Sequence, residues 1–425
     1  MTKPQDNLTD RLVATPSWGH RIIGMEGLRG LAAVTVLIGH TRSHLAADLD
    51  LGTAGQVMGL FLEGLLLFFA LSGFLLYRPF ASGIISGQRY PTTGRFLFNR
   101  VLRIYPAYLF VLTLVSFVFG LAYSRPFESS MDMTDTSTLV GYLDPLTYIA
   151  NVALVQTYLP WTMKTGLGVA WSLTVEVVFY LLLPVVAFVA CKLVGRLRPF
   201  IVALLPPMLL LIIGIAGKAT MSATFHPATS AAAFSLQWGD NWYAVFARSF
   251  VTHADLFAFG MFAAVLMVAF EQARLTTTAV TAWRWGSLSI GVVLAGATAV
   301  LNLEPWDDTG YAVLFGAVIA FVALPGPDGM PGMLARILES PAFRPLGLIS
   351  YGMYLWHLPV LWFLHERGVV GSSSVAGFVL NCVLVLSVTS ALATATYLLI
   401  EKPALRLKLR TDGRRSRIST QIAIR

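Results

Sequence analysis

The sequence predicts an all-α polytopic membrane protein with about ten transmembrane helices. Of its 425 residues, 56% are hydrophobic and 12% are charged, and the mean hydropathy is +0.70. A soluble domain carries about 25% charged residues, roughly twice this fraction. Apolar segments of spanning length recur along the chain, and basic residues gather in alternate loops. We therefore expect a multi-pass protein of the plasma or inner membrane.

Ten apolar segments are long enough to cross the bilayer core, which needs about 20 residues in a helix. An additional apolar piece at 144–158 is expected to lie at the interface or to re-enter the membrane. The expected spans are 23–41, 57–77, 104–123, 167–190, 199–217, 249–270, 285–301, 310–324, 346–364 and 374–400.

Basic residues are unevenly distributed between the two sides of these spans. With a cytosolic N-terminus, the cytosolic segments hold 23 of the 30 Lys and Arg residues, and the external loops hold six. This asymmetry follows the positive-inside rule and places both termini in the cytosol. We expect a cytosolic tail at 1–22, a transmembrane domain at 23–400 and a basic cytosolic tail at 401–425. The basic residues face anionic lipid or an anionic cytosolic ligand, so a nucleic-acid partner is not expected.

The first span contains two residues that are costly in a membrane, Arg29 and His40. Such residues are usually kept for a pathway or a reaction. They are eleven residues apart, so a helix places them on one face, roughly 16 Å apart along its axis. Alternatively, Arg29 extends to the cytosolic interface and His40 caps the outer end. His44 follows one turn after His40, but no third ligand accompanies them, so a metal is not expected.

The fourth span carries a carboxylate, Glu176, about 13 Å from the outer surface. A carboxylate at this depth needs a cationic or hydrogen-bonding partner. Arg29 and His40 are the candidates, and a purely structural contact between Glu176 and Arg29 is the alternative.

The ninth span has a polar stripe on an otherwise apolar helix. Ser350, Tyr354 and His357 recur at i, i+4 and i+7 and therefore share one face. Pro359 is expected to break this helix near mid-membrane, which is tolerated where the backbone lines a cavity. A simple hydrogen bond between helices is the alternative role for His357.

Two arginines, Arg100 and Arg103, are expected one helical turn apart at the cytosolic start of the third span. Guanidinium groups on one face suit bidentate binding of phosphate. Anchoring to lipid phosphates is the alternative, as for other basic residues on this side.

Together these residues resemble the acyltransferase-3 family of integral-membrane O-acyltransferases. Six motifs match in order through most of the chain. They are Glu26-Gly-Leu-Arg-Gly-Leu-Ala-Ala with His40, Phe68-Phe-Ala-Leu-Ser-Gly-Phe-Leu76, Arg100-x-x-Arg-Ile-Tyr-Pro106, Trp171-Ser-Leu-x-x-Glu176-x-x-Phe-Tyr180, the stripe from Ser350 to His357, and Ile400-Glu-Lys-Pro403. Two positions depart from the family pattern: Glu26 stands where the family usually has Asp, and Leu66 occupies a position that is often acidic.

The resemblance implies a donor and a class of acceptor. The donor is cytosolic acyl-CoA, most often acetyl-CoA, and the acceptor is a hydroxyl of an extracytoplasmic glycan or glycolipid. Surface polysaccharide, peptidoglycan, a trehalose-type glycolipid and a macrolide sugar all remain open as acceptors. The resemblance also implies that the motif residues Ser72, Trp171 and Ser172 help to bind the donor.

The resemblance also implies a role for each polar residue. Arg100 and Arg103 hold the nucleotide phosphates, and pantetheine passes Arg29. His40 acts as general base on the acceptor hydroxyl, because a neutral imidazole suits that task. Glu176 orients the imidazole. Tyr354 or Ser350 donates a hydrogen bond to the developing oxyanion, and His357 of the same stripe is also expected in the catalytic site. An acyl-histidine intermediate at His40 is the rival mechanism.

Two other classes of protein also accommodate ten spans with buried polar residues. A transporter or flippase of an envelope glycolipid would move its substrate without consuming a thioester. Against it, the chain shows no clear internal repeat and no paired broken spans. A membrane scaffold or glycan sensor would tolerate replacement of His40 and Glu176 without loss of any chemistry.

Overall fold

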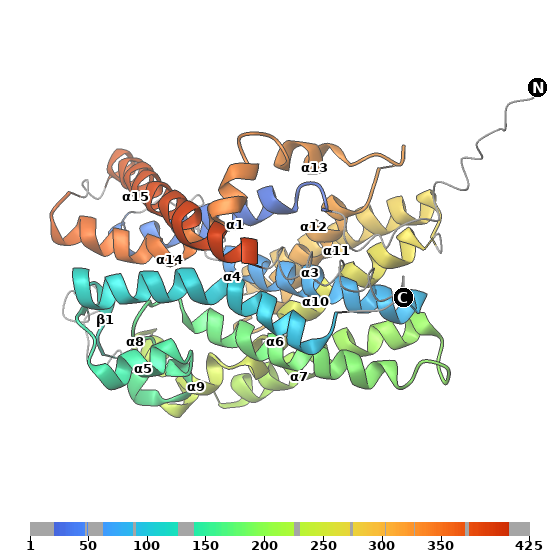
Figure 1. Cartoon of the computed structure of the whole chain (residues 1–425), viewed down its shortest axis with the longest axis horizontal. Coiled ribbons are helices and arrows are strands. Elements are labelled where there is room, and N and C mark those ends of the chain that lie inside the picture. The colour runs from blue at the N-terminus through green and yellow to red at the C-terminus, as the bar shows by residue number, and fades with distance from the viewer. Residues whose placement is uncertain are drawn as a thin grey trace, which may run out of the picture.

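The computed structural model of the protein describes residues 21–46, 49, 63–87, 91–125, 140–224, 230–272, 275–301, 303–326, 328–369 and 374–407. Figure 1 shows a bundle in which most of the long helices run along the longest axis of the molecule, while α15 is inclined to it. The long helices are α1 (Met25–Leu45), α3 (Gly64–Ser86), α4 (Thr93–Thr113), α6 (Trp171–Cys191), α7 (Pro199–Thr224), α10 (Phe250–Glu271), α11 (Thr277–Leu301), α12 (Asp307–Ala323), α14 (Arg344–Glu366) and α15 (Val375–Thr396).

Each of these helices overlaps one of the ten expected spans, so the all-α polytopic prediction is confirmed. Among the described residues, eight helices are long and apolar enough to cross a membrane. The other two expected spans correspond to α1, which contains Glu26, Arg29 and Arg42, and to α12, which has only 17 residues.

The remaining elements are short and lie between the long helices. Strands β1 (Ala122–Tyr123) and β2 (Val140–Gly141) pair antiparallel, and Figure 1 shows them at the same end of the bundle as α5, α8 and α9. The apolar piece expected at 144–158 forms α5 and a 3-10 turn rather than a span. The short elements are α5 (Pro145–Val152), η5 (Gln156–Tyr158), η6 (Pro160–Thr162), α8 (Ser230–Trp238), α9 (Trp242–Ala247) and α13 (Met333–Leu338).

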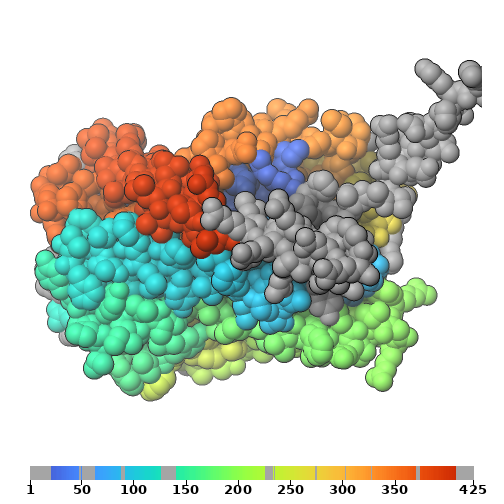
Figure 2. All heavy atoms as spheres, in the orientation of Figure 1, coloured from blue at the N-terminus to red at the C-terminus, as the bar shows by residue number. Residues whose placement is uncertain are grey.

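The helices differ in how deeply they are buried. The most apolar part of α3 is 78% buried, whereas that of α11 is 17% buried. Helix α10 packs against α3, α7 and α12, and α1 packs against α14. Figure 2 shows α4 crossing one face of the molecule, between α14 and α15 on one side and α5 to α7 on the other. Of the eight apolar helices, α3, α10 and α14 are the most deeply buried, and they form the centre of the bundle.

Close helix contacts at glycine hold this centre together. A side chain at Gly260 of α10 would overlap the backbone of Ala70 on α3, and one at Gly347 of α14 would overlap the carbonyl group of Glu26 on α1. Small residues let helix backbones approach in a membrane, where lipid tails give little driving force for association. The contact at Gly347 places the first and ninth expected spans, with their histidines, side by side.

Two helices depart from ideal α geometry at their C-terminal ends. Helix α4 continues as a π-helical segment, η3 (Leu114–Phe119), and α15 continues as η7 (Tyr397–Glu401). Such segments occur often at functional sites. Helix α14, by contrast, continues through Pro359, so the expected break near mid-membrane is wrong. Pro359 removes one intrahelical hydrogen bond, and dense packing of the residues around it preserves the helix.

Candidate functional site

A narrow cavity lies between α1, α3, α4, α6 and α14. Eight of the eleven site residues predicted from the sequence line this cavity; the other three are His40, His357 and Trp171. The lining combines charged, hydroxyl-bearing and aromatic side chains. It consists of Arg29, Leu65, Phe68, Phe69, Ser72, Arg100, Arg103, Ile104, Ser172, Leu173, Glu176, Tyr180, Ser350, Tyr351 and Tyr354.

The carboxylate in the cavity, Glu176, is held by a hydroxyl group. Ser72 of α3 donates to Glu176 Oε1 over 2.5 Å. Tyr180, one turn further along α6, lies beside both Glu176 and Arg100. Within the described part of the chain, Glu176 makes no hydrogen bond to His40 or Arg29, although the charges of Arg29 and Glu176 interact. The hydrogen-bond partner of Glu176 is therefore Ser72, and the sequence did not predict this pair.

Three arginines share the cavity with one carboxylate. Arg100 and Arg103 lie in the second and third turns of α4, because this helix begins at Thr93 rather than near 104. Arg103 forms an ion pair of 3.1 Å with Glu401, whose side chain is 2% exposed. The Nε of Arg100 is buried and has no hydrogen-bond acceptor among the described residues. A buried donor without an acceptor is costly, so this cavity fits an anionic ligand.

The hydroxyl groups on α6 and α14 form a short network. Tyr354 donates to the carbonyl oxygen of Val169 over 2.9 Å, and its oxygen lies 2.7 Å from that of Ser172, which also donates to the Val169 carbonyl over 3.2 Å. Ser350 donates to the carbonyl oxygen of Gly347 over 2.9 Å. The face predicted for α14 is thus formed, but both hydroxyl protons already have acceptors. A donor role toward an oxyanion requires either side chain to exchange its partner.

The two histidines expected on different spans meet. His40 Nδ1 lies 3.0 Å from the carbonyl oxygen of Val36, and His357 Nδ1 lies 3.2 Å from that of Met353. Carbonyl oxygens only accept, so both Nδ1 atoms carry the proton. His357 Nε2, 3.3 Å from His40 Nδ1, is then an acceptor. This arrangement leaves Nε2 of His40 unprotonated and, among the described residues, without a hydrogen-bond partner.

An aromatic and basic layer surrounds these histidines. The ring of His44 stacks on that of His40, with centroids 6.0 Å apart, and contacts Trp362. Lys164, in the loop before α6, has its ammonium group 4.4 Å from the Trp238 ring centroid, and its charge acts on His40. Burial and the nearby charge of Arg248 lower the pKa of Lys164 to about 7. No sequence motif marked Lys164, because only the fold brings its loop to α1.

The remaining predicted residue, Trp171, lies on the other side of the cavity wall. Its ring contacts Trp238, with centroids 5.7 Å apart, and His253, with centroids 5.3 Å apart. The guanidinium group of Arg248 covers the same two tryptophans. Trp171 therefore separates the cavity from a second group of polar residues, which the sequence did not mark.

Comparison with known proteins agrees with the motifs. The sequence model of the acyltransferase-3 family, described as an acyltransferase domain, matches residues 22–398. The chain belongs to the acyltransferase-3 family. It is a multi-pass membrane acyltransferase, and the cavity described above lies within the matched region. No solved structure matches the chain.

Three relatives illustrate the range of this family. Nodulation protein 10 of Rhizobium leguminosarum bv. viciae is 27% identical over 422 residues, covering 94% of this chain and 97% of that protein. O-acetyltransferase OatA of Staphylococcus aureus is 24% identical over 397 residues, covering 89% of this chain and 56% of OatA. Putative peptidoglycan O-acetyltransferase YrhL of Bacillus subtilis is 25% identical, covering 93% of this chain and 56% of YrhL. The chain thus spans about half the length of OatA and YrhL.

Proposed function

We propose that this acyltransferase moves an acyl group, most simply acetyl, from cytosolic acyl-CoA to a hydroxyl of an extracytoplasmic glycan or glycolipid. The observation that carries the proposal is the lining of one cavity. Arg29, Arg100 and Arg103 share it with the Ser72–Glu176 pair and with Tyr354, whose ring lies beside His357. The phosphate-binding cations thus share one cavity with Tyr354, which contacts His357, the neighbour of the proposed base His40.

The donor fits the cationic side of this cavity. The unused Nε of Arg100 and the guanidinium groups of Arg29 and Arg103 suit the phosphates of a nucleotide thioester. Glu401 holds Arg103 in place through an ion pair, so the charge of Arg103 is partly balanced within the protein. These residues accordingly favour an anionic donor over a neutral one.

The chemistry requires one proton transfer and one acyl transfer. The unprotonated Nε2 of His40 accepts the proton of the acceptor hydroxyl while its oxygen attacks the thioester carbonyl. The C–S bond breaks, the acyl group is transferred to the acceptor oxygen, and the thiolate takes the proton from Nε2 of the His40 imidazolium. His357 accepts from the Nδ1–H of His40 and so holds the tautomer that leaves Nε2 free. The similarity to YrhL, a putative peptidoglycan O-acetyltransferase, supports a glycan as acceptor.

Purified protein in lipid nanodiscs, supplied with labelled acetyl-CoA and an envelope fraction from its own cells, tests this function. We expect His40→Ala to reduce transfer at least 100-fold while acetyl-CoA binding persists. Replacing Arg100 and Arg103 together by Ala should raise the KM for acetyl-CoA more than it lowers kcat. Arg196→Ala, at an exposed loop position, is the matched control.

Three results would contradict the proposal. Transfer by His40→Ala at the wild-type rate would exclude this base, and an unchanged KM would reduce Arg100 and Arg103 to lipid anchors. Movement of a glycolipid across the bilayer without thioester consumption would indicate the transporter class instead.

A further inference from the structure

A second polar cavity lies beyond Trp171, at the end of the bundle predicted to face outside. Its volume is about 160 Å³, and it shares no lining residue with the central cavity. It is formed by the starts of α3, α10 and α12, the end of α7, and the segment around α9. Five separate parts of the chain thus meet at one site.

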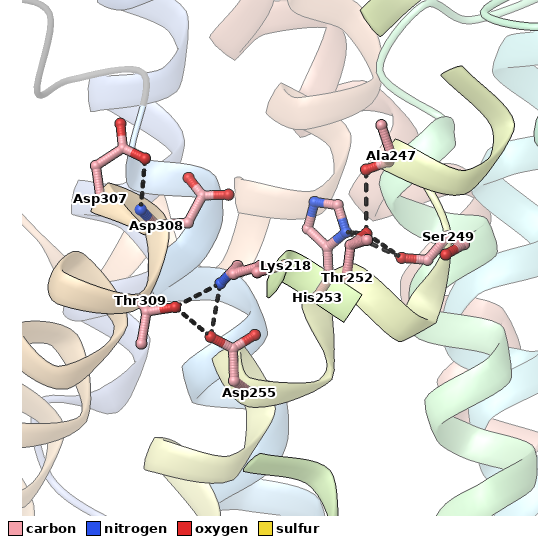
Figure 3. Close-up of polar contacts among 9 residues, drawn as sticks. All are labelled: Lys218, Ala247, Ser249, Thr252, His253, Asp255, Asp307, Asp308 and Thr309. Carbon is pink, nitrogen blue, oxygen red and sulfur yellow. Dashed lines mark hydrogen bonds and ion pairs between the residues drawn. The ribbon is translucent and has the colours of Figure 1, made fainter. Parts of the chain in front are cut away.

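One wall of this cavity is a buried ionic network. Lys218 of α7 donates to Asp255 over 2.6 Å and to Thr309 over 2.7 Å, and Thr309 donates to the same carboxylate oxygen over 2.6 Å (Figure 3). Lys218 is 1% exposed and lines the cavity. An ammonium group has three donors, and two of them are used within the described residues.

Three other side chains that line the cavity carry polar groups without hydrogen-bond partners. His253 is 3% exposed, and its Nδ1 donates to the carbonyl oxygen of Ser249 over 3.0 Å, which leaves Nε2 as an acceptor. Neither Nε2 of His253 nor the carboxylates of Asp308 and Glu63 have a hydrogen bond within the described part of the chain. Figure 3 shows the Asp308 carboxylate between Asp307 and His253, without a contact to the residues drawn. Asp308 and Glu63 are partly buried, and polar groups that line a cavity without partners indicate a polar ligand.

The arrangement of charges selects the class of ligand. Four carboxylates, those of Glu63, Glu304, Asp307 and Asp308, line the cavity together with Lys218 and Arg248. The carboxylates disfavour a phosphate, and the two cations disfavour a metal ion. Among the described residues, no three His, Cys, Asp or Glu side chains are grouped to hold a metal. Interleaved acceptors and donors fit a neutral polyhydroxylated molecule, whose hydroxyl groups both donate and accept.

The cavity is separated from the central cavity by one layer of aromatic side chains. His253 contacts Phe69, with ring centroids 6.1 Å apart, and Trp171, with centroids 5.3 Å apart. Phe69 lines the central cavity, and Trp171 precedes Ser172, which does so as well. A glycan with one sugar unit bound in the second cavity would therefore have its neighbouring units close to the central cavity.

We propose that the second cavity is a binding subsite for one sugar unit of the acceptor, remote from the hydroxyl that is acylated. The inference rests on the proposed function and names the part of the protein that selects the acceptor. Contacts to a remote part of a substrate orient its reacting group, so loss of the subsite weakens acceptor use and leaves the donor unaffected.

The test titrates both substrates with protein in nanodiscs. Labelled acetyl-CoA is the donor, and an envelope glycan fraction from the protein's own cells is the acceptor, added by mass. We expect Asp308→Asn and Glu63→Gln each to raise the apparent acceptor KM at least fivefold and to leave the KM for acetyl-CoA unchanged. Asp240→Asn, an exposed residue at the same end, is the matched control and should change neither value.

The outcomes are distinguishable. An unchanged acceptor KM in both variants, or an equal rise in the KM of both substrates, overturns the subsite. Failure of the wild-type protein to transfer acetyl at all overturns the proposed function instead. Because Glu63 precedes α3 and Asp308 lies in α12, misfolding of one variant leaves the other to decide.

Discussion

At the scale of single residues, His40 has its reactive nitrogen defined by its neighbours. The carbonyl oxygen of Val36 and Nε2 of His357 both lie at its Nδ1, so the proton resides there. The free Nε2 is the atom that a general base or an acyl-histidine nucleophile uses, and the geometry serves both mechanisms. Glu176, tied to Ser72, instead contributes negative charge among the arginines.

Lys164 gives a second prediction at the residue scale, which concerns how the stability of the protein depends on pH. Its pKa is about 7 in the folded protein, against 10.5 for an unperturbed lysine, because of burial and the charge of Arg248. Between these values the unfolded state binds more protons, so the free energy of unfolding rises with pH. From pH 6 to pH 8 this group alone contributes at most about 1.4 kcal/mol.

Thermal unfolding in detergent at several pH values measures this contribution. We expect Lys164→Met to flatten the rise of the apparent Tm between pH 6 and pH 8 and to stabilise the protein most at pH 6. Lys192→Met, at an exposed position, should retain the wild-type slope. An identical slope in the Lys164→Met variant would show that this lysine is not buried as described.

At the scale of elements, the contact between α1 and α14 controls the site. A Cβ at Gly347 would overlap the carbonyl group of Glu26, which belongs to the backbone and cannot rotate away. We expect Gly347→Ala to separate the two helices, to destabilise the protein by about 1–3 kcal/mol and to reduce transfer. The separation also weakens the contact between His40 and His357.

The matched control for Gly347→Ala is Gly296→Ala on α11. A Cβ at Gly296 meets no atom within 4 Å, so this variant should keep its activity and gain slightly in helix stability. Apparent Tm and transfer rate are the two measurements. If Gly347→Ala behaves like the control, the close approach of α1 and α14 does not limit the site.

The sequence predicted the elements better than their ends. Each expected span overlaps one long helix, because long apolar runs have no other stable form in lipid. The start of α4 at Thr93, however, places Arg100 inside the helix rather than at its mouth. Polar residues at a helix end are compatible with both loop and helix, so hydropathy cannot locate the boundary. The break predicted at Pro359 was wrong for a similar reason, because the residues packed around a proline decide whether the helix continues through it.

At the scale of the whole molecule, the sequence could name residues but not pair them. Periodicity along one helix correctly grouped Ser350 and Tyr354 on the cavity. Pairing across helices depends on crossing points such as Gly260 on Ala70, which no single-helix pattern specifies. The partnership of Ser72 with Glu176 and that of Arg103 with Glu401 were therefore not predictable, and neither was the second cavity, which needs five parts of the chain.

The orientation of the bundle is the last prediction, and it rests on the distribution of basic residues. In a background with Cys191→Ala and Cys382→Ala, one new cysteine is placed at each end of the molecule. Tyr142→Cys lies before α5 and is 65% exposed in the wild type, whereas Arg196→Cys lies in the exposed loop after α6. In intact cells, a membrane-impermeant maleimide should label the first variant, and should label the second only after permeabilisation. The reverse pattern would place the α4 end that carries Arg100 and Arg103 toward the external medium. Acyl-CoA in the cytosol could not then reach these arginines, because they would lie on the external side of the membrane. The proposed donor would be wrong even if the protein still transferred acyl groups.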